Sequence, residues 1–387
     1  MTLAFVVTLS AVAIDVSIPA IPLALDDLAA AAKQGQLMIA VYLMGYGAGQ
    51  IPFGLFADRY GRMPSLRVGL LIFLAASLAT VLAPSIEFLL ISRLVQGFGG
   101  AAAAVVARAI ARDLADGAEL ARLSGLLVSA LAIATLVAPI IGSAVIMSES
   151  WRGVFGVSLF MAALALILMN LNLQETRSPG VLASTVSAQL AESLQAFLGS
   201  TVSILGAIIV AFTFFAYMGV VAGIAQVTVS TYCLSSSAVG VVFSGAVVFY
   251  VAAGRIGAGM AKTEGAPEVL RTGIRFFIVT GLSCSYMLYV ESPTFWLFWL
   301  ALLPFFCGLG FVFPAATAIT LEPLPEVAGF AASILGTFQV FAGALGAAAT
   351  SMFYDGSPDS VLGVVVTGCV AAVLIFFAAL RSCLVFD

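Results

Sequence analysis

The sequence contains no histidine and few charged residues. Charged side chains make up only 9% of its 387 residues, whereas a soluble globular protein carries about 25%, so the chain has too few polar groups to cover a soluble surface. The five cysteines are scattered singly and form no Cys-x-x-Cys pair. These absences argue against a soluble protein and against a zinc, haem or histidine-based catalytic site. We therefore expect no metal, no cofactor and no enzymatic activity.

Long apolar runs are abundant: hydrophobic residues make up 62% of the chain, and its mean hydropathy is +1.17. A spanning helix needs about 20 mainly apolar residues, whereas the strands of a membrane barrel alternate polar and apolar residues. The runs therefore indicate an all-α polytopic membrane protein. Twelve spans are predicted at 3–24, 36–57, 66–84, 87–111, 120–147, 152–173, 201–223, 236–261, 271–291, 294–319, 327–353 and 359–382.

One connection between the predicted spans is long, at residues 174–200. It divides the chain into an N-terminal bundle (1–173) and a C-terminal bundle (201–387) of six spans each. Glycines and basic residues recur at 254–262, the position in the second half that 54–62 occupies in the first. This echo supports two repeats around a central cavity. Apolar residues at helical spacing inside the linker fit a short helix on the membrane surface, and a solvated linker helix fits them equally well.

Basic residues are distributed unevenly between the two sides of the predicted topology. Twelve of the 15 Lys and Arg residues fall on one side, Lys33 and Arg152 fall on the other, and Arg93 lies within a span. Cytoplasmic connections are enriched in Lys and Arg. The distribution predicts that both termini and the linker are cytoplasmic, in a multi-pass protein of the inner (plasma) membrane.

Two ionisable residues lie well inside predicted spans: Asp15 in the first and Arg93 in the fourth. A charged side chain at membrane depth costs about 2.5–3.5 kcal/mol and normally faces the protein interior or an aqueous cavity. Asp15 can gain and lose a proton, which makes it the candidate proton carrier. Arg93 stays charged and can hold a carboxylate or orient a substrate. The alternative is an ion pair between them that only ties the two spans together.

Several aromatic and polar residues within the spans are candidates for a substrate cavity, because such side chains build adaptable pockets. More often, residues of this kind face lipid or pack against other helices. The candidates are Tyr42, Tyr46, Gln96, Phe215, Tyr217, Phe338 and Gln339.

Three short motifs are more specific. Residues 54–62 read GLFADRYGR, residues 93–101 read RLVQGFGGA and residues 138–143 read APIIGS. They resemble the signatures G-x-L-A-D-R-x-G-R-K, R-x-x-Q-G-x-G-A and G-P-x-x-G-G of the major facilitator superfamily, the last being its antiporter signature. Met63 stands where the first signature has a basic residue, and Ala138 and Ser143 replace glycines of the third, which weakens the inference of antiport.

Further stretches resemble the Bcr/CflA subfamily of the twelve-spanning drug:proton antiporters. They lie at 42–50, 112–114, 151–155, 175–176 and 328–338, so the resemblance covers essentially the whole chain. It implies the major facilitator fold, with 12 transmembrane helices in two six-helix halves around a central cavity. It also implies that Arg93 lies near the proton-coupling site, and it makes Pro139 and Gly142 an antiporter-like motif that bends span five and allows close packing against span eight.

The first motif is expected to act as a conformational latch. A carboxylate at Asp58 can face the positive N-terminus of a helix, which in the family is span eleven, beginning here near Val327. Arg62 can pair with Asp113 at the end of span four, and both contacts together would hold the two halves in the outward-open state. Gly61 lets the connection turn tightly. The predicted latch residues are Gly54, Asp58, Arg59, Gly61, Arg62 and Asp113.

The sequence predicts a proton-coupled exporter of small, amphipathic, drug-like molecules that works by alternating access. Its partners would be the substrate, protons and the lipid bilayer, with no nucleic acid, and nothing in the chain demands more than a monomer. An exporter of a physiological metabolite, such as an amino acid or a short peptide, is the first alternative. A proton symporter for a nutrient is the second. A membrane sensor and a membrane-embedded enzyme rank lower, because no soluble domain and no nucleophile–base pair stands out.

Overall fold

The computed structural model describes residues 1–115, 117–148, 150–176, 194–291, 293–324 and 328–381. These residues form helices joined by short connections, with no strand among them. The chain divides into two compact units. Unit 1 comprises Met1–Ala188 and Ser236–Ser244, and unit 2 comprises Gln189–Ser235 and Gly245–Asp387. Most of the predicted linker, including the greater part of its surface helix, lies outside the described residues.

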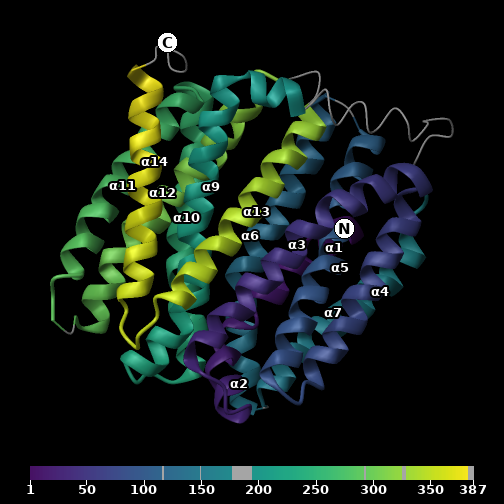
Figure 1. Ribbon diagram of the computed structural model, residues 1–387. Helices are drawn as coiled ribbons and strands as arrows, with labels where there is room; N and C mark the ends of the chain where they lie inside the picture. The colour runs from purple at the N-terminus through teal and green to yellow at the C-terminus, as the bar shows by residue number, and fades with distance from the viewer. Residues whose placement is uncertain (116, 149, 177–193, 292, 325–327, 382–387) are drawn as a thin grey trace. The chain divides into compact units, whose positions relative to one another are not determined.

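Unit 1 is built from the helices of the first half of the chain (Figure 1). Within it α3 packs against α5, α4 packs against α5 and α7, and α1 packs against α5, α6 and α7. The helices are α1 (Thr2–Asp15), α2 (Ile21–Asp27), α3 (Ala32–Tyr60), α4 (Arg62–Val81), α5 (Ile86–Leu114), α6 (Gly117–Ser148) and α7 (Trp151–Asn172).

Unit 2 holds the helices of the second half, and α10 begins in unit 1 and continues in unit 2 at Gly245. In unit 2, α9 packs against α12, α13 and α14, and α11 packs against α12 and α14. A π-helical turn, Val227–Thr231, extends α9. The helices are α9 (Thr201–Gln226), α10 (Ser236–Thr263), α11 (Ala266–Met287), α12 (Phe295–Leu321), α13 (Ala328–Met352) and α14 (Asp359–Arg381).

Eleven of the described helical segments are long and apolar enough to cross a membrane, with Thr2–Asp27 counted as one. They correspond to eleven of the twelve predicted spans. The remaining predicted span, 271–291, corresponds to α11, which is not among these eleven segments. This helix carries three charged residues near its start, where the Glu268 carboxylate lies 3.0 Å from the Arg271 guanidinium and 3.6 Å from that of Arg275.

The first predicted span is a broken helix. α1 ends at Asp15, a 3-10 turn covers Ile18–Ala20, and α2 begins at Ile21. Pro19 is the second residue of the turn, and Pro22 is the second residue of α2. Proline is tolerated there because its missing N–H would have no partner in the helix, but it cannot continue a preceding helix. The prolines therefore place Asp15 at a helix end, next to irregular backbone.

α5 lies at the centre of the close helix packing in unit 1. Gly97 faces the main chain of α3 at Tyr42, and Gly100 faces α1. Gly99 faces α4, where an added methyl group would lie 2.6 Å from the Phe73 nitrogen. In a bilayer, small residues allow backbones to approach in this way. Side chains from three neighbouring helices can therefore reach the polar groups of α5.

Replacing Gly97 with Ala is expected to lower the free energy of unfolding by about 3 kcal/mol, because the new methyl group would strike main-chain atoms of α3 that cannot swing aside. Gly156→Ala in α7 is the matched control, since no atom lies within 4 Å of its added methyl group and Ala is the better helix former. Thermal unfolding of the purified variants in one detergent measures the difference. Equal melting temperatures for the two variants would contradict the packing argument.

Candidate functional site: two polar networks in unit 1

The first network lies at the corner where α3 ends and α4 begins. α3 ends at Tyr60, α4 begins at Arg62, and Gly61 between them has φ +107°. Residues with a side chain rarely adopt this backbone conformation, whereas glycine adopts it freely. The predicted tight turn is present, and α4 begins directly after it.

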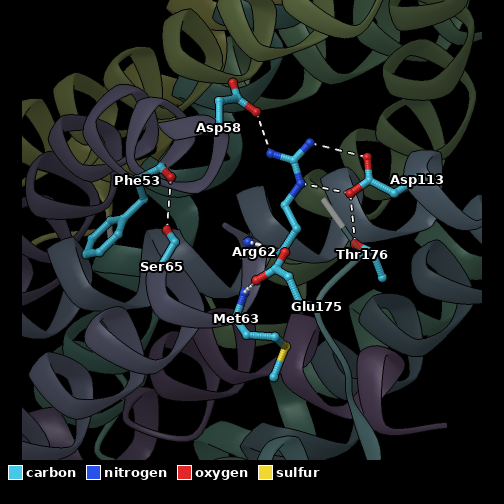
Figure 2. Close-up of polar contacts among 8 residues, drawn as sticks. All are labelled: Phe53, Asp58, Arg62, Met63, Ser65, Asp113, Glu175 and Thr176. Carbon is cyan, nitrogen blue, oxygen red and sulfur yellow. Dashed lines mark hydrogen bonds and ion pairs between the residues drawn. The ribbon is translucent and has the colours of Figure 1, made fainter. Parts of the chain in front are cut away.

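Arg62 is the centre of this corner network, as Figure 2 shows. Its Nε donates to Asp113 Oδ2 at 2.8 Å and its Nη2 donates to Asp113 Oδ1 at 3.2 Å, which makes the pair bidentate. Its Nη1 donates to Asp58 Oδ1. The Arg62 side chain is only 13% exposed, and such charge-assisted, two-pronged contacts are the strong ones. The predicted Arg62–Asp113 ion pair is confirmed.

Two further residues of the corner network had no role in the sequence prediction. Both oxygens of the Glu175 carboxylate accept from the α4 N-terminus, Oε1 from Arg62 N at 2.8 Å and Oε2 from Met63 N at 3.0 Å. The Thr176 hydroxyl donates to Asp113 Oδ2 at 2.8 Å. In the sequence they form only a short stretch, 175–176, that resembles the subfamily. A carboxylate directly after a span could have suggested a cap for a helix N-terminus, but its sequence position does not say which helix.

The remaining latch residues lie around the same corner. Gly54 faces α5, where an added methyl group would lie 3.6 Å from Val105, and the Arg59 guanidinium lies 5.3 Å from the ring centre of Tyr60. The contacts of Arg62 with Asp58, Asp113 and Glu175 all lie within unit 1. The expected partner of Asp58, the N-terminus of α13 (Ala328–Met352), belongs to unit 2, so the latch between halves stays a prediction.

The second network surrounds Arg93, which is fully buried. Its Nη1 donates to Ala13 O at 3.1 Å and to Gln96 Oε1 at 2.7 Å. The guanidinium carbon lies 4.5 Å from the ring centre of Tyr42 and 5.6 Å from that of Phe155. Helices α1, α3, α5 and α7 thus each contribute to one cage. Carbonyl oxygens and aromatic faces are the groups that stabilise a cation without a counter-ion.

Asp15 is only 3% exposed, at the end of α1. The side chain of Thr135 in α6 lies near its carboxyl group. Among the described residues, no ion pair links Asp15 to Arg93 or to another cation. The ion pair that the sequence left open as an alternative is therefore not present. A carboxylate in such a place is costly unless a proton or a cation neutralises it.

The span-five motif places its residues on two faces of α6. Gly142 faces the turn after α1, where an added methyl group would lie 3.0 Å from Pro19. Ser143 Oγ accepts from Gly240 N of α10 at 3.1 Å, and Ser244 Oγ of α10 donates to Leu136 O at 2.8 Å. The first part of α10, Ser236–Ser244, is thus fastened to α6 within unit 1. The contact uses Ser143, a position where the chain departs from the motif.

The candidate cavity residues come from both units. Tyr42 and Gln96 are fully buried in the Arg93 network, and Gln96 Nε2 donates to Ser77 Oγ at 2.8 Å. In unit 2, Phe338 of α13 is 54% exposed. Tyr46, Phe215, Tyr217 and Gln339 are half-buried. Their assignment to a substrate cavity stays a prediction, and Tyr42 and Gln96 have a packing role in addition.

A third cluster, which the sequence analysis missed, lies at the opposite end of unit 1. Asp27 Oδ2 accepts from Trp151 Nε1 at 2.9 Å and from Arg152 Nη1 at 2.6 Å. Arg152 Nη2 donates to Ala83 O at 3.1 Å, and its guanidinium lies 4.1 Å from the Trp151 ring centre. The cluster joins the ends of α2 and α4 to the start of α7. It is a brace at the end remote from the corner.

Comparison with known proteins identifies the family of the chain. The family model described as Major Facilitator Superfamily matches residues 3–347. Multidrug resistance protein D of Escherichia coli (strain K12) is 27% identical over 87% of this chain and 84% of that protein. An uncharacterized MFS-type transporter, YdgK, of Bacillus subtilis (strain 168) is 35% identical over 42% of this chain and 41% of its own. A chloramphenicol resistance protein of Pseudomonas aeruginosa is 36% identical over 38% of this chain and 35% of its own. The chain thus spans less than half the length of the last two.

Solved structures share the fold at low identity. A bacterial homologue of the human lysosomal transporter Spinster, in an inward-facing and occupied conformation, matches with a TM-score of 0.78 and 15% identity, over 98% of this chain and 96% of that one. A D-xylose–proton symporter matches with a TM-score of 0.73 and 16% identity, over 97% and 96%. These likenesses establish the fold. With a family model that covers most of the sequence, the chain belongs to the major facilitator superfamily of membrane transporters.

Proposed function

We infer that this transporter is a proton-coupled exporter of small, amphipathic, drug-like molecules, which crosses the inner membrane with both termini in the cytoplasm. The observation that carries the proposal is the Asp15 carboxyl group, 3% exposed at the broken end of α1. Among the described residues it has a hydroxyl group nearby but no cation partner. Such a group is suited to take up a proton and release it again. Relatives named multidrug and chloramphenicol resistance proteins support the substrate class.

In the proposed cycle, a proton from outside binds Asp15 while the substrate leaves outward. Substrate that binds from the cytoplasm then favours loss of the proton. The two halves rock about the membrane midplane, so that each side gains access in turn. The Arg93 cage contacts α1 at Ala13, two residues before Asp15. It therefore holds the segment of α1 that carries the coupling group.

The corner network is proposed to act at the cytoplasmic side of this cycle. Arg62 holds Asp58 on one side and Asp113 on the other, so the Asp58 carboxylate is kept in one orientation. A carboxylate held in this way is preorganised to meet the positive end of a helix in the other half. Within unit 1 the network is therefore a brace. The latch between the halves would be the contact that Asp58 makes with its partner.

Transport by the protein in everted inner-membrane vesicles tests the proposal, with ethidium and chloramphenicol as probes. Respiration acidifies the vesicle interior, which a pH-sensitive dye reports. Adding either probe is expected to release protons from the vesicles containing the protein and to drive accumulation of the probe inside. Vesicles from cells without the protein are the control. Absence of proton release with a panel of such cations and neutral drugs would contradict drug:proton antiport.

A proton symporter for a nutrient is the second candidate. The departures of the span-five motif at Ala138 and Ser143 favour it, because that motif marks antiporters in the family. A symporter moves its substrate and the proton in the same direction. In right-side-out vesicles, added substrate would then make the external medium more alkaline. An exporter of an amino acid or short peptide would instead show antiport with those compounds and no response to drugs.

A further inference from the structure

We propose that Glu175 and Thr176 are positioning residues that fasten the start of the linker to the α3–α4 corner and thereby set the geometry of the Arg62–Asp113 pair. The inference rests on the proposed function, because it concerns how the same latch is operated. The two residues are neighbours in sequence, yet they hold two different helices. Glu175 binds the beginning of α4, and Thr176 binds a side chain at the end of α5.

Glu175 supplies hydrogen-bond acceptors to a helix start that lacks them. The first four N–H groups of a helix have no acceptor within the helix. Glu175 accepts from two of them, at 2.8 Å from Arg62 N and 3.0 Å from Met63 N. Its negative charge also lies at the positive end of the α4 dipole. The carboxylate therefore ties the chain after α7 to the residue whose side chain centres the network.

Gly61 is part of the same contact. A methyl group on Gly61 would lie 2.5 Å from Glu175 Oε2, well inside van der Waals distance. The glycine thus serves two purposes, since it adopts the positive φ of the turn and leaves space for the carboxylate. The requirement for glycine at this position follows from the docked Glu175 as well as from the turn.

Thr176 acts on the opposite side of Arg62. Asp113 Oδ2 accepts from both Arg62 Nε and the Thr176 hydroxyl, each at 2.8 Å. A second donor on one oxygen restricts the rotation of the carboxylate and holds it in the orientation that its bidentate pair with Arg62 requires. Thr176 reaches the ion pair through Asp113 and does not contact Arg62 in the described network.

The placement in the chain gives these contacts a mechanical consequence. α7 ends at Asn172, and the chain then passes Glu175 and Thr176 before it continues through the linker to α9 at Thr201. A change in the path of the linker therefore acts first on the two residues that hold Arg62 and Asp113. Through Arg62, it acts on the Asp58 carboxylate.

Hydrogen–deuterium exchange and transport measured on the same purified full-length variants test this proposal. The variants are Glu175→Ala, Glu175→Gln, Thr176→Val and Thr176→Ser. The matched controls are Glu119→Gln, in an exposed i,i+3 pair with Arg122, and Thr263→Val, whose exposed hydroxyl bonds only to its own helix among the described contacts. Transport is measured as ethidium efflux from reconstituted vesicles.

Glu175→Ala is expected to speed exchange of the Arg62 and Met63 amides by about tenfold, because loss of a cap releases N–H groups that the helix itself cannot satisfy. Glu175→Gln should have a smaller effect, since one amide oxygen can still accept. Both Glu175→Ala and Thr176→Val should lower kcat several-fold with KM near the wild-type value, because the substrate site is untouched. Thr176→Ser, which keeps the hydroxyl, and both controls should behave as wild type.

The possible results separate the fastening of the chain at Glu175 from its effect on transport. Unchanged exchange of the Arg62 and Met63 amides in Glu175→Ala would overturn the fastening, whether or not the protein transports ethidium. Faster exchange with an unaltered kcat would make Glu175 a structural cap only and would overturn its positioning role. A wild-type protein that moves none of the probes would overturn the proposed function, while the exchange result would still decide whether the linker is fastened.

Discussion

Replacing Asp15 with Asn is expected to abolish proton-coupled efflux while the protein still folds. Asn has nearly the same size, and its amide remains a polar group beside the Thr135 side chain, which lies near the Asp15 carboxyl group. It cannot take up or release a proton at any pH of interest. Because the buried carboxyl group lacks a cation partner among the described residues, its removal relieves a cost rather than breaking an ion pair. The melting temperature should therefore stay equal or rise.

Efflux in everted vesicles, with the proton gradient imposed by respiration, measures this effect. Asp26→Asn is the matched control, because Asp26 is an exposed carboxylate in the neighbouring α2 and its change removes the same charge. Drug binding to Asp15→Asn, followed by tryptophan fluorescence, should persist. Full proton-driven efflux by Asp15→Asn would exclude Asp15 as the coupling residue.

Replacing Arg93 with Lys is expected to lower the free energy of unfolding by about 2 kcal/mol and to reduce transport by an order of magnitude or more, although the positive charge is kept. The cage depends on a planar guanidinium. Nη1 bonds to both Ala13 O and Gln96 Oε1, and the flat group lies over the Tyr42 ring. A Lys ammonium is compact and cannot occupy all these contacts at once. The Gln96 or Ala13 oxygen would then be buried without a donor.

Arg67→Lys is the control for this substitution, because Arg67 bonds to Asn170 at an exposed position. It should change neither stability nor transport. The measurements are thermal unfolding in detergent and the initial rate of efflux. If Arg93→Lys retained wild-type stability and rate, the shape of the guanidinium would be irrelevant, and Arg93 would act only through its charge. A loss of transport with unchanged stability would instead separate the coupling role of Arg93 from its packing role.

The corner network and the Arg93 cage place different demands on unit 1. Arg62 is charged, partly exposed and paired with two carboxylates, so its contacts can be exchanged for water when the halves move. Arg93 is fully buried and held by carbonyl and aromatic groups, so leaving its cage would cost several kcal/mol. The corner is therefore the part suited to switch, and the cage is the part suited to stay rigid around α1.

Much of the fold could be read from local features of the sequence. The low content of charge and the long apolar runs predicted a polytopic helical protein, because the cost of placing each side chain in lipid is a local property. The first predicted span is confirmed as Thr2–Asp27, but the hydropathy of the run does not register the break in its helix at Pro19 and Pro22. The Arg62–Asp113 pair could be anticipated because it follows from motifs with known signatures.

The partners of the candidate site depended on the tertiary structure. Glu175 and the α4 start that it caps lie 113 residues apart in the sequence, and the cage of Arg93 is assembled from four helices. Apolar periodicity tells which face of a helix is buried, but several of these helices are apolar almost all round, so the pattern names no neighbour. The sequence by itself therefore determined the class, the spans and the charged residues that need explanation. Only the packing of the helices decided that Arg93 meets rings and carbonyls instead of Asp15, and that Glu175 closes the corner opened by Gly61.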